Sequence, residues 1–454
     1  MPFLTAGEIA EVCSGRLIGD GSATVSTIVA DSRESFDGAG FVAVRSGHSF
    51  VADAFAGGAG LAIVERAECL PDGATGVVVE DVVHALARLS ADVRSRLRAQ
   101  VVGITGSVGK TLTKDFTAAA VSPRHRVHAS PRSFNTEVGV PLSILSCPDD
   151  ADVLVLEMGA RHPGEISELA EIARCQIGVV TGIGKTHIGE FGSRATIART
   201  KAELLDALPA DGLAVVPADD EFLPLLAATA TARTTTVGPG GTVRFRADRV
   251  ELPGRTVGVV SLDSSVVEVV LPVPGRALMR NAAIALGVAR ELEVDAETAA
   301  AAIARCTPSS SRMEVSRLGG WTFVNDAYNA NPSSTASALR TVRELASSAP
   351  LWAVLGEMAE LGSIADSEHA RIGRLVAALG YTGVVVVGER ADALAEAAGS
   401  IAVRVATNDE AADVAIDRVP SGAYLLVKGS LVTGLKGFGE ILTTKLARAR
   451  AGIE

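Results

Sequence analysis

Beginning at Val101, short apolar segments alternate with longer stretches of helical composition, and this alternation limits the fold more than any other feature. The apolar segments are VVGIT, DVLVLEMG, QIGVVTG and GLAVVPADD. Strands and helices that alternate in this way form parallel sheets, because the chain must cross back over the sheet before the next parallel strand can begin. We therefore predict a central α/β domain with a parallel sheet over residues 97–308.

Two further α/β domains are predicted on either side. Residues 1–96 hold short apolar runs joined by glycine-rich connections and end in the helical pattern HALARLSADVRSRL. Residues 236–275 have a period of two, which predicts antiparallel strands at the edge of the central sheet. After the polar stretch 308–311, the segments WTFVND, LWAVLG, VVVVG, IAVRVA and YLLVKG predict a Rossmann-like domain over residues 309–454.

Composition excludes several classes of function. The formal net charge is −11 at pH 7, and no run of Lys and Arg is dense enough to neutralise a track of phosphates, so we expect no nucleic-acid partner. The apolar runs fall far short of the roughly 18 residues of a membrane span, and no signal-peptide pattern is found, so we expect a cytoplasmic protein without a membrane partner. The five cysteines form no CxxC pair, which argues against a disulfide framework or a zinc site.

The apolar segment 101–105 leads directly into GSVGKT (106–111) and then into a stretch of helical composition. A strand, a glycine-rich loop and a helix in this order can cradle phosphate with backbone N–H groups, while the lysine neutralises its charge and the threonine reaches Mg²⁺. Ile104 stands where the common GxxxxGKT pattern has its first glycine, and a chance glycine-rich turn is the alternative. The predicted phosphate-binding residues are Gly106, Ser107, Gly109, Lys110 and Thr111.

Two later residues, Glu157 and His187, are candidates for a metal site beside this loop. Glu157 ends an apolar strand at its carboxyl end, where ligands bind in open parallel sheets, so its carboxylate can hold Mg²⁺; the alternative is a solvated glutamate. His187 follows the next strand and is as easily an ordinary loop histidine as a ligand. Lys201 lies in a predicted helix, where its residue type favours the surface.

A series of motifs, in order along the chain, resembles the Mur ligases. The likeness covers nearly the whole chain and is greatest to the members that join D-alanyl-D-alanine to UDP-N-acetylmuramoyl-tripeptide in peptidoglycan precursor synthesis. The motifs are GSVGKTLTK, SFNTEVGVP, EMGARHPGEI, THIGEFGS, RTKAEL, RMEV, NDAYNANP, VLGEMAELG with His369, and VKGS.

The resemblance implies an ATP-dependent ligase that activates a carboxylate as an acyl phosphate. An amine then attacks through a tetrahedral intermediate, and ADP and phosphate are released, which requires charge neutralisation more than a dedicated nucleophile. ATP and Mg²⁺ are the implied cofactors. The implied partners are a nucleotide-linked peptide acid and D-alanyl-D-alanine or a related amine, and we expect a monomer.

The resemblance also implies roles for individual residues. Lys110, Glu157, His187 and Lys201 form the implied catalytic set, with Thr111, Glu157, His187 and Lys201 around Mg²⁺. Lys201 matches a lysine that the family carbamylates, so the resemblance contradicts the surface position that its residue type favours. The implied nucleotide contacts are Asn281, which matches the position that reads adenine, Arg312 and Asp326. The implied substrate contacts are Asp31, Ser32, Arg33, Asn135, Thr136, Asn329, Asn331, Glu357 and Lys428.

Some of these residues have a simpler explanation, and some positions depart from the family. Asn329, Asn331, Glu357 and Lys428 suit turns and helix caps as well as a substrate. The loop between Val44 and His48 is shorter than in the family. The other departures are Gly182 for a usual Asn, Ala277 for a usual His, Thr136 for a common second Asn and Leu431 for a frequent Arg.

These departures keep two other functions open. One is a Mur-like ligase that joins a different acid and amine in a specialised pathway, which the shorter loop and the lost polar residues favour. The other is a nucleotide-binding regulatory protein without turnover. The second is disfavoured, because a protein that only binds a nucleotide does not need the residues around a second metal.

Overall fold

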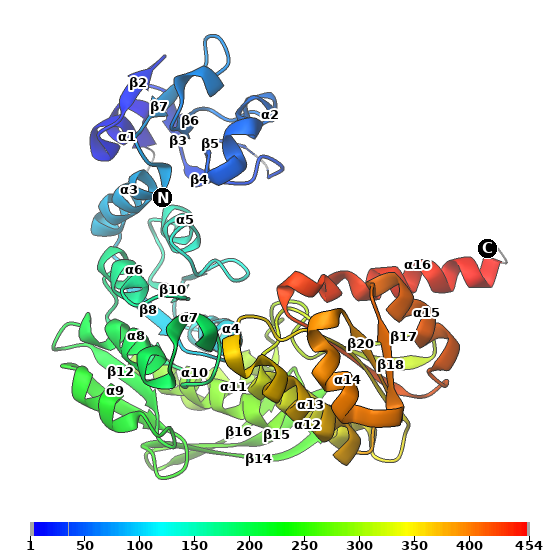
Figure 1. The fold of residues 1–454 in the computed structure, drawn as a ribbon. Coiled ribbons are helices and arrows are strands. Elements are labelled where there is room, and N and C mark those ends of the chain that lie inside the picture. Colours follow the sequence, from blue (N-terminus) through cyan, green and yellow to red (C-terminus); the bar gives the residue numbers. More distant parts are fainter. Residues whose placement is uncertain (1–3, 35, 452–454) are drawn as a thin grey trace.

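The computed structural model describes residues 4–34 and 36–451, and within them the strands form three α/β units in chain order (Figure 1). In this view the first unit lies above the central sheet, and the last unit lies beside it. The α/β class with three domains is confirmed. No helix in the described part of the chain is both long and apolar enough to cross a membrane.

The first unit is a small sheet in the order β2-β7-β6-β5-β4, parallel except for β2. Its strands carry the apolar runs that the sequence analysis identified. The long helix predicted at its end is present and packs on the short helix that opens the chain. The elements are β1 (Leu4–Thr5), α1 (Ala6–Cys13), β2 (Arg16–Ile18), β3 (Thr24–Val25), β4 (Thr27–Val29), β5 (Ala39–Val42), α2 (Val51–Ala56), β6 (Ala62–Val64), β7 (Gly76–Val78) and α3 (Val82–Arg96).

The central sheet runs in the order β16-β15-β14-β13-β12-β11-β8-β10-β9. The strands from β13 to β9 are parallel, and β14, β15 and β16 are antiparallel at one edge, as predicted. Its strands are β8 (Gln100–Thr105), β9 (Val127–Ala129), β10 (Val153–Glu157), β11 (Ile177–Val180), β12 (Leu213–Pro217), β13 (Arg233–Val237), β14 (Val243–Glu251), β15 (Arg255–Leu262) and β16 (Ser265–Leu271).

Helices cover both faces of this sheet, which explains why its strands are apolar throughout. On β8, Val101 belongs to the core on the side of α6 and α8, whereas Val102 and Ile104 belong to the core under α4, α10 and α11. The helices are α4 (Lys110–Val121), α5 (Gly139–Leu145), α6 (Glu165–Ala173), α7 (Ile188–Phe191), α8 (Arg194–Asp206), α9 (Leu223–Thr229), α10 (Met279–Glu291) and α11 (Ala296–Ala304).

The last unit has the strand order β17-β18-β22-β19-β20-β21, parallel except for β17. A helix follows each parallel strand, as predicted for a Rossmann-like domain. The elements are β17 (Glu314–Leu318), β18 (Trp321–Asn325), α12 (Pro332–Ala346), β19 (Leu351–Gly356), α13 (Ala365–Ala378), β20 (Gly383–Val387), α14 (Asp392–Ala398), β21 (Ala402–Val405), α15 (Asn408–Arg418), β22 (Tyr424–Lys428) and α16 (Phe438–Ala451).

A buried arginine fastens the first unit to the central one. Arg94, near the end of α3, donates from Nε to the carbonyl of Ala173 at 2.7 Å and from Nη2 to that of Arg174 at 3.4 Å. A third donation, from Nη1, reaches the carbonyl of Leu97 in the linker at 3.0 Å. These bonds satisfy carbonyl groups at the end of α6 that have no partner within the helix.

Candidate active site

The glycine-rich loop lies between β8 and α4 and has the backbone that phosphate binding requires. Gly106 and Gly109 have φ angles of 137° and 88°, which disfavour any other residue. A Cβ at Gly106 would lie 2.1 Å from Thr181 Oγ1, and one at Gly109 would lie 2.9 Å from Asn281 Oδ1. Helix α4 begins directly at Lys110, so its free N–H groups face the loop. The predicted order of strand, glycine-rich loop and helix is therefore present.

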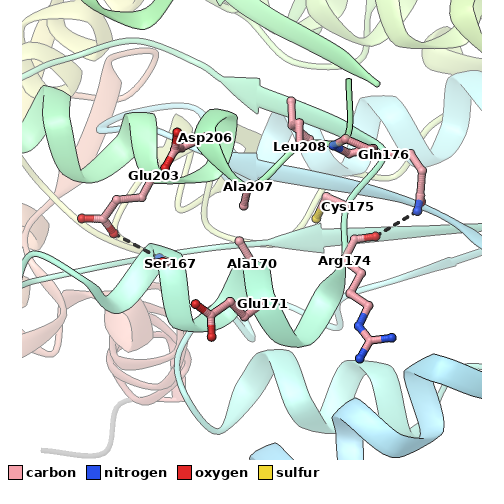
Figure 2. Close-up of a pocket in the computed structure, with 11 residues that line it drawn as sticks. Ser167, Ala170, Glu171, Arg174, Cys175, Gln176, Glu203, Asp206, Ala207 and Leu208 are labelled. Atoms are coloured by element: carbon pink, nitrogen blue, oxygen red, sulfur yellow. Dashed lines mark hydrogen bonds between the residues drawn. The ribbon is translucent and has the colours of Figure 1, made fainter. Parts of the chain in front are cut away.

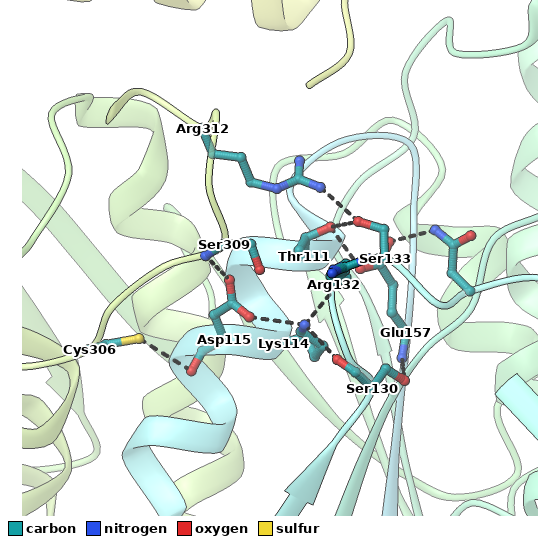
Figure 3. A network of polar contacts seen from close by, with 11 residues as sticks. Thr111, Lys114, Asp115, Ser130, Arg132, Ser133, Glu157, Cys306, Ser309 and Arg312 are labelled. Atoms are coloured by element: carbon teal, nitrogen blue, oxygen red, sulfur yellow. Dashed lines mark hydrogen bonds and ion pairs between the residues drawn. The ribbon is translucent and has the colours of Figure 1, made fainter. Parts of the chain in front are cut away.

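Glu157 lies at the bottom of this site and is buried, so the alternative of a solvated strand-end glutamate is wrong. Its Oε2 accepts a hydrogen bond from Thr111 Oγ1 at 2.7 Å, and its Oε1 accepts one from Asn135 Nδ2 at 2.7 Å (Figure 3). Within the described residues the Glu157 carboxylate makes no ion pair. A buried carboxylate bonded only to neutral donors is an environment that favours a bound cation.

A second layer around the loop contains Arg312, which the resemblance implied, together with Ser133 and Tyr328, which were not predicted from the sequence. Ser133 lies 3.3 Å from Thr111 Oγ1 and accepts a hydrogen bond from Arg312 Nη2 at 2.9 Å, and the Arg312 guanidinium stacks 4.0 Å over the Tyr328 ring. Figure 3 shows Arg312 reaching Ser133 from the chain that leads into the last unit. The structure therefore places Arg312 beside the phosphate loop, although it comes from another domain.

Lys114 holds the loop that carries Ser133. Its buried ammonium donates to the carbonyls of Ser130 and Arg132 at 2.8 and 2.9 Å and lies 3.0 Å from Asp115 Oδ1. The lysine is the second one in GSVGKTLTK, four residues after Lys110, which puts it one helical turn further along α4. That spacing was the available sequence signal for its position close to the site.

Lys201 is buried, with 3% of its surface exposed, so the surface position that its residue type favours is wrong. Its Nζ lies 5.6 Å from the centre of the Phe191 ring, and within the described residues it makes no ion pair. Burial is the main cause that lowers the pKa of Lys201 to about 7, and the charge of Lys110 adds to the effect. Helix α8 thus presents a lysine that is largely a neutral amine above neutral pH.

His187 stands at the start of α7 with a left-handed backbone, φ 57°. Its Nδ1 contacts Glu360 Oε2 of the last unit, and Glu360 Oε1 in turn lies 3.2 Å from Arg161 Nε. The side chain is about a quarter exposed. The histidine therefore lies at the interface between the central and last units.

Asn281 of α10 is buried against the phosphate loop, and its Nδ2 has no hydrogen-bond partner in the described part of the chain. Ser107 Oγ also has no hydrogen-bond partner among the described residues. Buried polar atoms are nearly always paired, so these two groups are available to a ligand. Asn281 lies against Gly109, and Ser107 lies against Gly184.

Asp326 and Lys428 are bonded to each other. Lys428 Nζ lies 2.5 Å from Asp326 Oδ2 and also donates to the carbonyls of Asp326 and Asn329. Lys428 is buried, whereas the other oxygen of Asp326 accepts from the backbone N–H of Met313. The pair ties β22 to the chain that carries Arg312.

The other residues implied on the amine side are spread over loops of the last unit. Asn331 is the N-cap of α12, and its Oδ1 accepts a hydrogen bond from Ser334 N at 2.9 Å. It therefore has the helix-cap role that was the alternative to substrate binding. Asn329 is exposed. Glu357 lines a pocket of about 290 Å³ together with Glu360, His369 and Arg390.

The residues implied on the nucleotide-sugar side lie in the first unit. Arg33 donates from Nε and Nη2 to both carboxylate oxygens of Asp31, and these bonds lower the pKa of Asp31 to about 2. Arg33 is exposed and Ser32 is half-buried. Arg132, beside the phosphate loop, also contributes to the lowered pKa of Asp31, so its charge acts across the space between the two units.

Three of the departures from the family pattern, at Gly182, in the loop after Val44 and at Thr136, have a local structural context. Gly182 has φ 151°, a conformation that suits glycine, and its carbonyl accepts from Ser107 N at 2.9 Å. The short loop after Val44 forms a 3₁₀ helix, Arg45–Phe50. Thr136 is exposed and weakly caps the turn into α5, at 3.4 Å. Leu431 is 62% exposed, and nothing in the structure explains why it replaces an arginine.

One pocket lies away from this site. It has a volume of about 500 Å³ between α6 and α8 and contains none of the residues predicted to function (Figure 2). Its Glu203 is already engaged, because it accepts from the N–H groups of Gly164 and Ser167 at 2.9 and 3.0 Å. The pocket therefore does not take part in the phosphate site.

Known proteins match the chain in both sequence and structure. Residues 104–289 match the Mur ligase middle domain, and residues 311–431 match the Mur ligase, glutamate ligase domain. The UDP-N-acetylmuramoyl-tripeptide–D-alanyl-D-alanine ligase of Mycobacterium tuberculosis is 38% identical, with 97% of each chain covered. The ligase of the same name from Escherichia coli is 29% identical, with 88% of this chain and 89% of that one covered.

Two solved structures share the fold over nearly the whole chain. MurF from Acinetobacter baumannii superposes with a TM-score of 0.87 at 27% identity, covering 98% of this chain and 99% of that one. MurF from Thermotoga maritima, solved in complex with ADP, superposes with a TM-score of 0.80 at 28% identity and covers 94% of this chain and 99% of its own.

Proposed function

The chain belongs to the Mur ligase family, and from this premise we infer that it uses ATP to join D-alanyl-D-alanine to UDP-N-acetylmuramoyl-tripeptide. One observation carries this inference, namely the likeness over 97% of the chain to a ligase of that name. The local geometry supports the ATP-dependent part, because a phosphate cradle, a buried carboxylate and cationic groups from two domains meet at one place. The proposal therefore assigns a role to each of these groups.

ATP would bind with its phosphates in the loop from Gly106 to Thr111. The loop N–H groups and the free N–H groups at the N-terminus of α4 would donate hydrogen bonds to the phosphate oxygens. Lys110 Nζ now donates to the Gly106 carbonyl at 2.9 Å and is close enough to turn to a phosphate in the loop. The unpartnered amide of Asn281 would serve the nucleotide.

Mg²⁺ would lie beside Thr111 and Glu157. No group of three or more His, Cys, Asp or Glu side chains suited to a metal occurs within residues 4–34 and 36–451. Mg²⁺ suits such a site, because it commonly takes only one or two protein carboxylates and fills its other positions with phosphate oxygens and water. When bound, it would neutralise charge on the phosphoryl group being transferred. A second ion would bind near His187.

The reaction proposed for the site has two steps. A carboxylate oxygen of the peptide acid attacks the γ-phosphorus, the bond to ADP breaks, and an acyl phosphate forms. The amine then attacks the acyl carbon, loses a proton, and phosphate leaves. Lys110 and Arg312 are placed to stabilise the negative charge that builds up on the phosphoryl oxygens, which is where such sites gain most of their rate.

Lys201 is proposed to act as a carbamate rather than as an ammonium. Its neutral amine would attack CO₂, forming an N–C bond and releasing one proton, which leaves a carboxylate-like group. A lysine cation beside Mg²⁺ would repel the metal, whereas a carbamate would attract it. The burial of Lys201 without an ion pair supports this proposal, because it favours the uncharged amine that the reaction needs.

We propose domain limits at 96/97 and 308/309, which fall in the connections between α3 and β8 and between α11 and β17. The first domain would hold the UDP end of the acid at Asp31, Ser32 and Arg33. The last domain would hold the amine near Asn329, Asn331, Glu357 and Lys428. Asn135 and Thr136 would lie between the two substrates.

We also propose that the enzyme works as a monomer in the cytoplasm. The cysteines that the structure describes are free, as is usual in a reducing compartment. A second candidate function, ligation of a different acid and amine, is favoured by the departures at Gly182, Ala277 and Leu431 and by the short loop before His48.

The deciding experiment measures ADP release by the purified chain with Mg²⁺ and ATP. We expect release with UDP-N-acetylmuramoyl-tripeptide and D-alanyl-D-alanine, and only background release when either is left out. The proposal would be contradicted if ADP were released with an unrelated acid and amine but not when UDP-N-acetylmuramoyl-tripeptide is the acid. That result would establish the second candidate. ATP binding without acceptor-dependent hydrolysis would instead indicate the regulatory protein.

A further inference from the structure

Glu360 crosses from the last unit to His187, and the contact is held from several sides. One carboxylate oxygen contacts His187 Nδ1, and the other lies 3.2 Å from Arg161 Nε. The backbone carbonyl of the same residue accepts from Gly189 N at 3.1 Å. Both the side chain and the backbone of Glu360 are therefore engaged with the central unit.

The backbone on both sides of this contact is unusual. His187 and Glu360 have φ angles of 57° and 61°, a left-handed conformation that is uncommon for residues other than glycine. Gly189 and Gly362 also meet there, and a Cβ at Gly189 would lie 2.9 Å from Gly362 N. Such conformations cost free energy, persist only where the surroundings impose them, and cluster at functional sites.

His187 differs from the two buried histidines of the chain in the use of its ring. His48 and His369 engage both nitrogens: each has Nδ1 near a backbone carbonyl, and each has Nε2 accepting from a backbone N–H. In His187 only Nδ1 has a partner among the described residues. The Nε2 lone pair is free when the proton lies on Nδ1.

We propose that Glu360 is a positioning residue that fixes the His187 ring for metal binding, so that docking of the last domain completes the metal site. A carboxylate on one ring nitrogen holds the proton there and leaves the other nitrogen to the metal, an arrangement common around metal-binding histidines. The inference rests on the proposed function, since it takes His187 as a Mg²⁺ ligand, and adds a residue from another domain that controls it.

The test measures metal binding without turnover. Mn²⁺ replaces Mg²⁺ because its electron paramagnetic resonance reports binding, and a non-hydrolysable ATP analogue is present without acid or amine. We expect Glu360→Ala to weaken Mn²⁺ binding by about 10- to 100-fold, as for other residues that hold a metal ligand. In a His187→Ala background the same change should have no further effect.

A second readout follows the ring itself. Nitrogen NMR of His187 should show the Nδ1–H tautomer in the unaltered chain and a shift toward Nε2–H in Glu360→Ala. Glu360→Gln keeps an acceptor oxygen and should retain the original tautomer while losing part of the Mn²⁺ affinity. This variant also keeps the side-chain shape, so the test does not depend on the alanine variant folding well.

The control is Glu344→Ala, which removes a different contact between the same two units, the 2.7 Å ion pair with Arg276. It should leave Mn²⁺ affinity and the tautomer unchanged. The inference is overturned by an equal loss in the control, which would indicate domain docking in general. It is also overturned by unchanged binding in Glu360→Ala or in His187→Ala. Because no substrate is present, failure of the ligase assay does not affect these outcomes.

Discussion

Lys201 and Glu157 are both ionisable side chains held almost entirely out of water. Their partners differ. Burial favours the uncharged form of Lys201, which makes no ion pair among the described residues, whereas both oxygens of Glu157 accept hydrogen bonds from neutral donors. In the proposed mechanism, the Glu157 carboxylate and a carbamate on Lys201 would both offer negative charge to the metal.

Carbamylation of Lys201 should depend on pH. The pKa of about 7 means that the neutral amine, the form that attacks CO₂, becomes the main one as the pH rises above 7. In ¹³C-bicarbonate, the carbamate signal should therefore grow between pH 6 and 8. Lys114, which is buried but ion-paired, should show none, so Lys114→Ala should leave the signal unchanged. A signal that is absent in the native chain at pH 8 would refute the proposal.

Loss of the carbamate should abolish activity, and an added carboxylate should restore part of it. Lys201→Ala should be nearly inactive, and added formate or acetate should restore part of the turnover, because the site lacks only a negative charge. Lys201→Arg, which keeps a cation, should be inactive and should not be rescued. Equal activity of the alanine variant with and without carboxylate, at the level of the unaltered enzyme, would exclude Lys201 from the mechanism.

Lys110→Ala should lower kcat by at least about 10²- to 10³-fold, the usual cost of one group that stabilises transition-state charge. Stability should change by no more than about 1 kcal/mol, because the side chain makes one hydrogen bond, to Gly106. Lys445→Ala, on the far helix α16, provides the control and should keep full activity. The catalytic role of Lys110 is established if Lys110→Ala loses turnover while its free energy of unfolding in urea stays unchanged.

The sequence was sufficient to place residues whose position depends on local context. Lys110, Thr111 and Glu157 follow from a strand, a loop and the end of a neighbouring strand. Lys201 could not be placed from its helix, because only the packing of α8 under the sheet decides which face is buried. Glu360 lies about 170 residues from His187, and no pattern within either segment shows that they meet.

At the level of elements, the apolar runs predicted the strands of all three sheets well. Among the strands that were not predicted, β9 and β17 lie at sheet edges, where one or both faces are only partly buried, whereas β13 lies inside the central sheet and has the threonine-rich sequence RTTTV. An edge strand needs no continuous apolar run, so its sequence resembles a loop. The sequence patterns also did not predict the order of the strands in each sheet.

Helix α12 allows a test of whether Asn331 serves the fold or the substrate. Its side chain caps the helix at Ser334 N, so Asn331→Ala should lower the free energy of unfolding by about 0.5–2 kcal/mol. Asn331→Ser retains a good cap and should keep both stability and activity. If KM for the amine rises in both variants while the serine variant stays stable, Asn331 contacts substrate as well.

At the scale of the whole molecule, Arg94 is a buried polar link between the first and central domains, where α3 also packs on α5 and α6. Arg94→Leu should lower the free energy of unfolding by about 3 kcal/mol, because it removes hydrogen bonds from a buried cation to three carbonyls. Arg88→Leu, on the same helix with one exposed bond to Ser14, should cost less than about 0.5 kcal/mol. Urea denaturation of the two variants checks the difference.

The bonds of Arg94 to the end of α6 also set how far the first domain stands from the phosphate loop. A substrate anchored by its nucleotide in the first domain must extend its free carboxyl group across that gap to meet ATP. A precursor with too few amino acids would fall short, and one already extended would overshoot. The fixed distance between the first domain and the phosphate loop would then select substrates by their length. The order in which the peptide chain is built would be enforced by that distance alone.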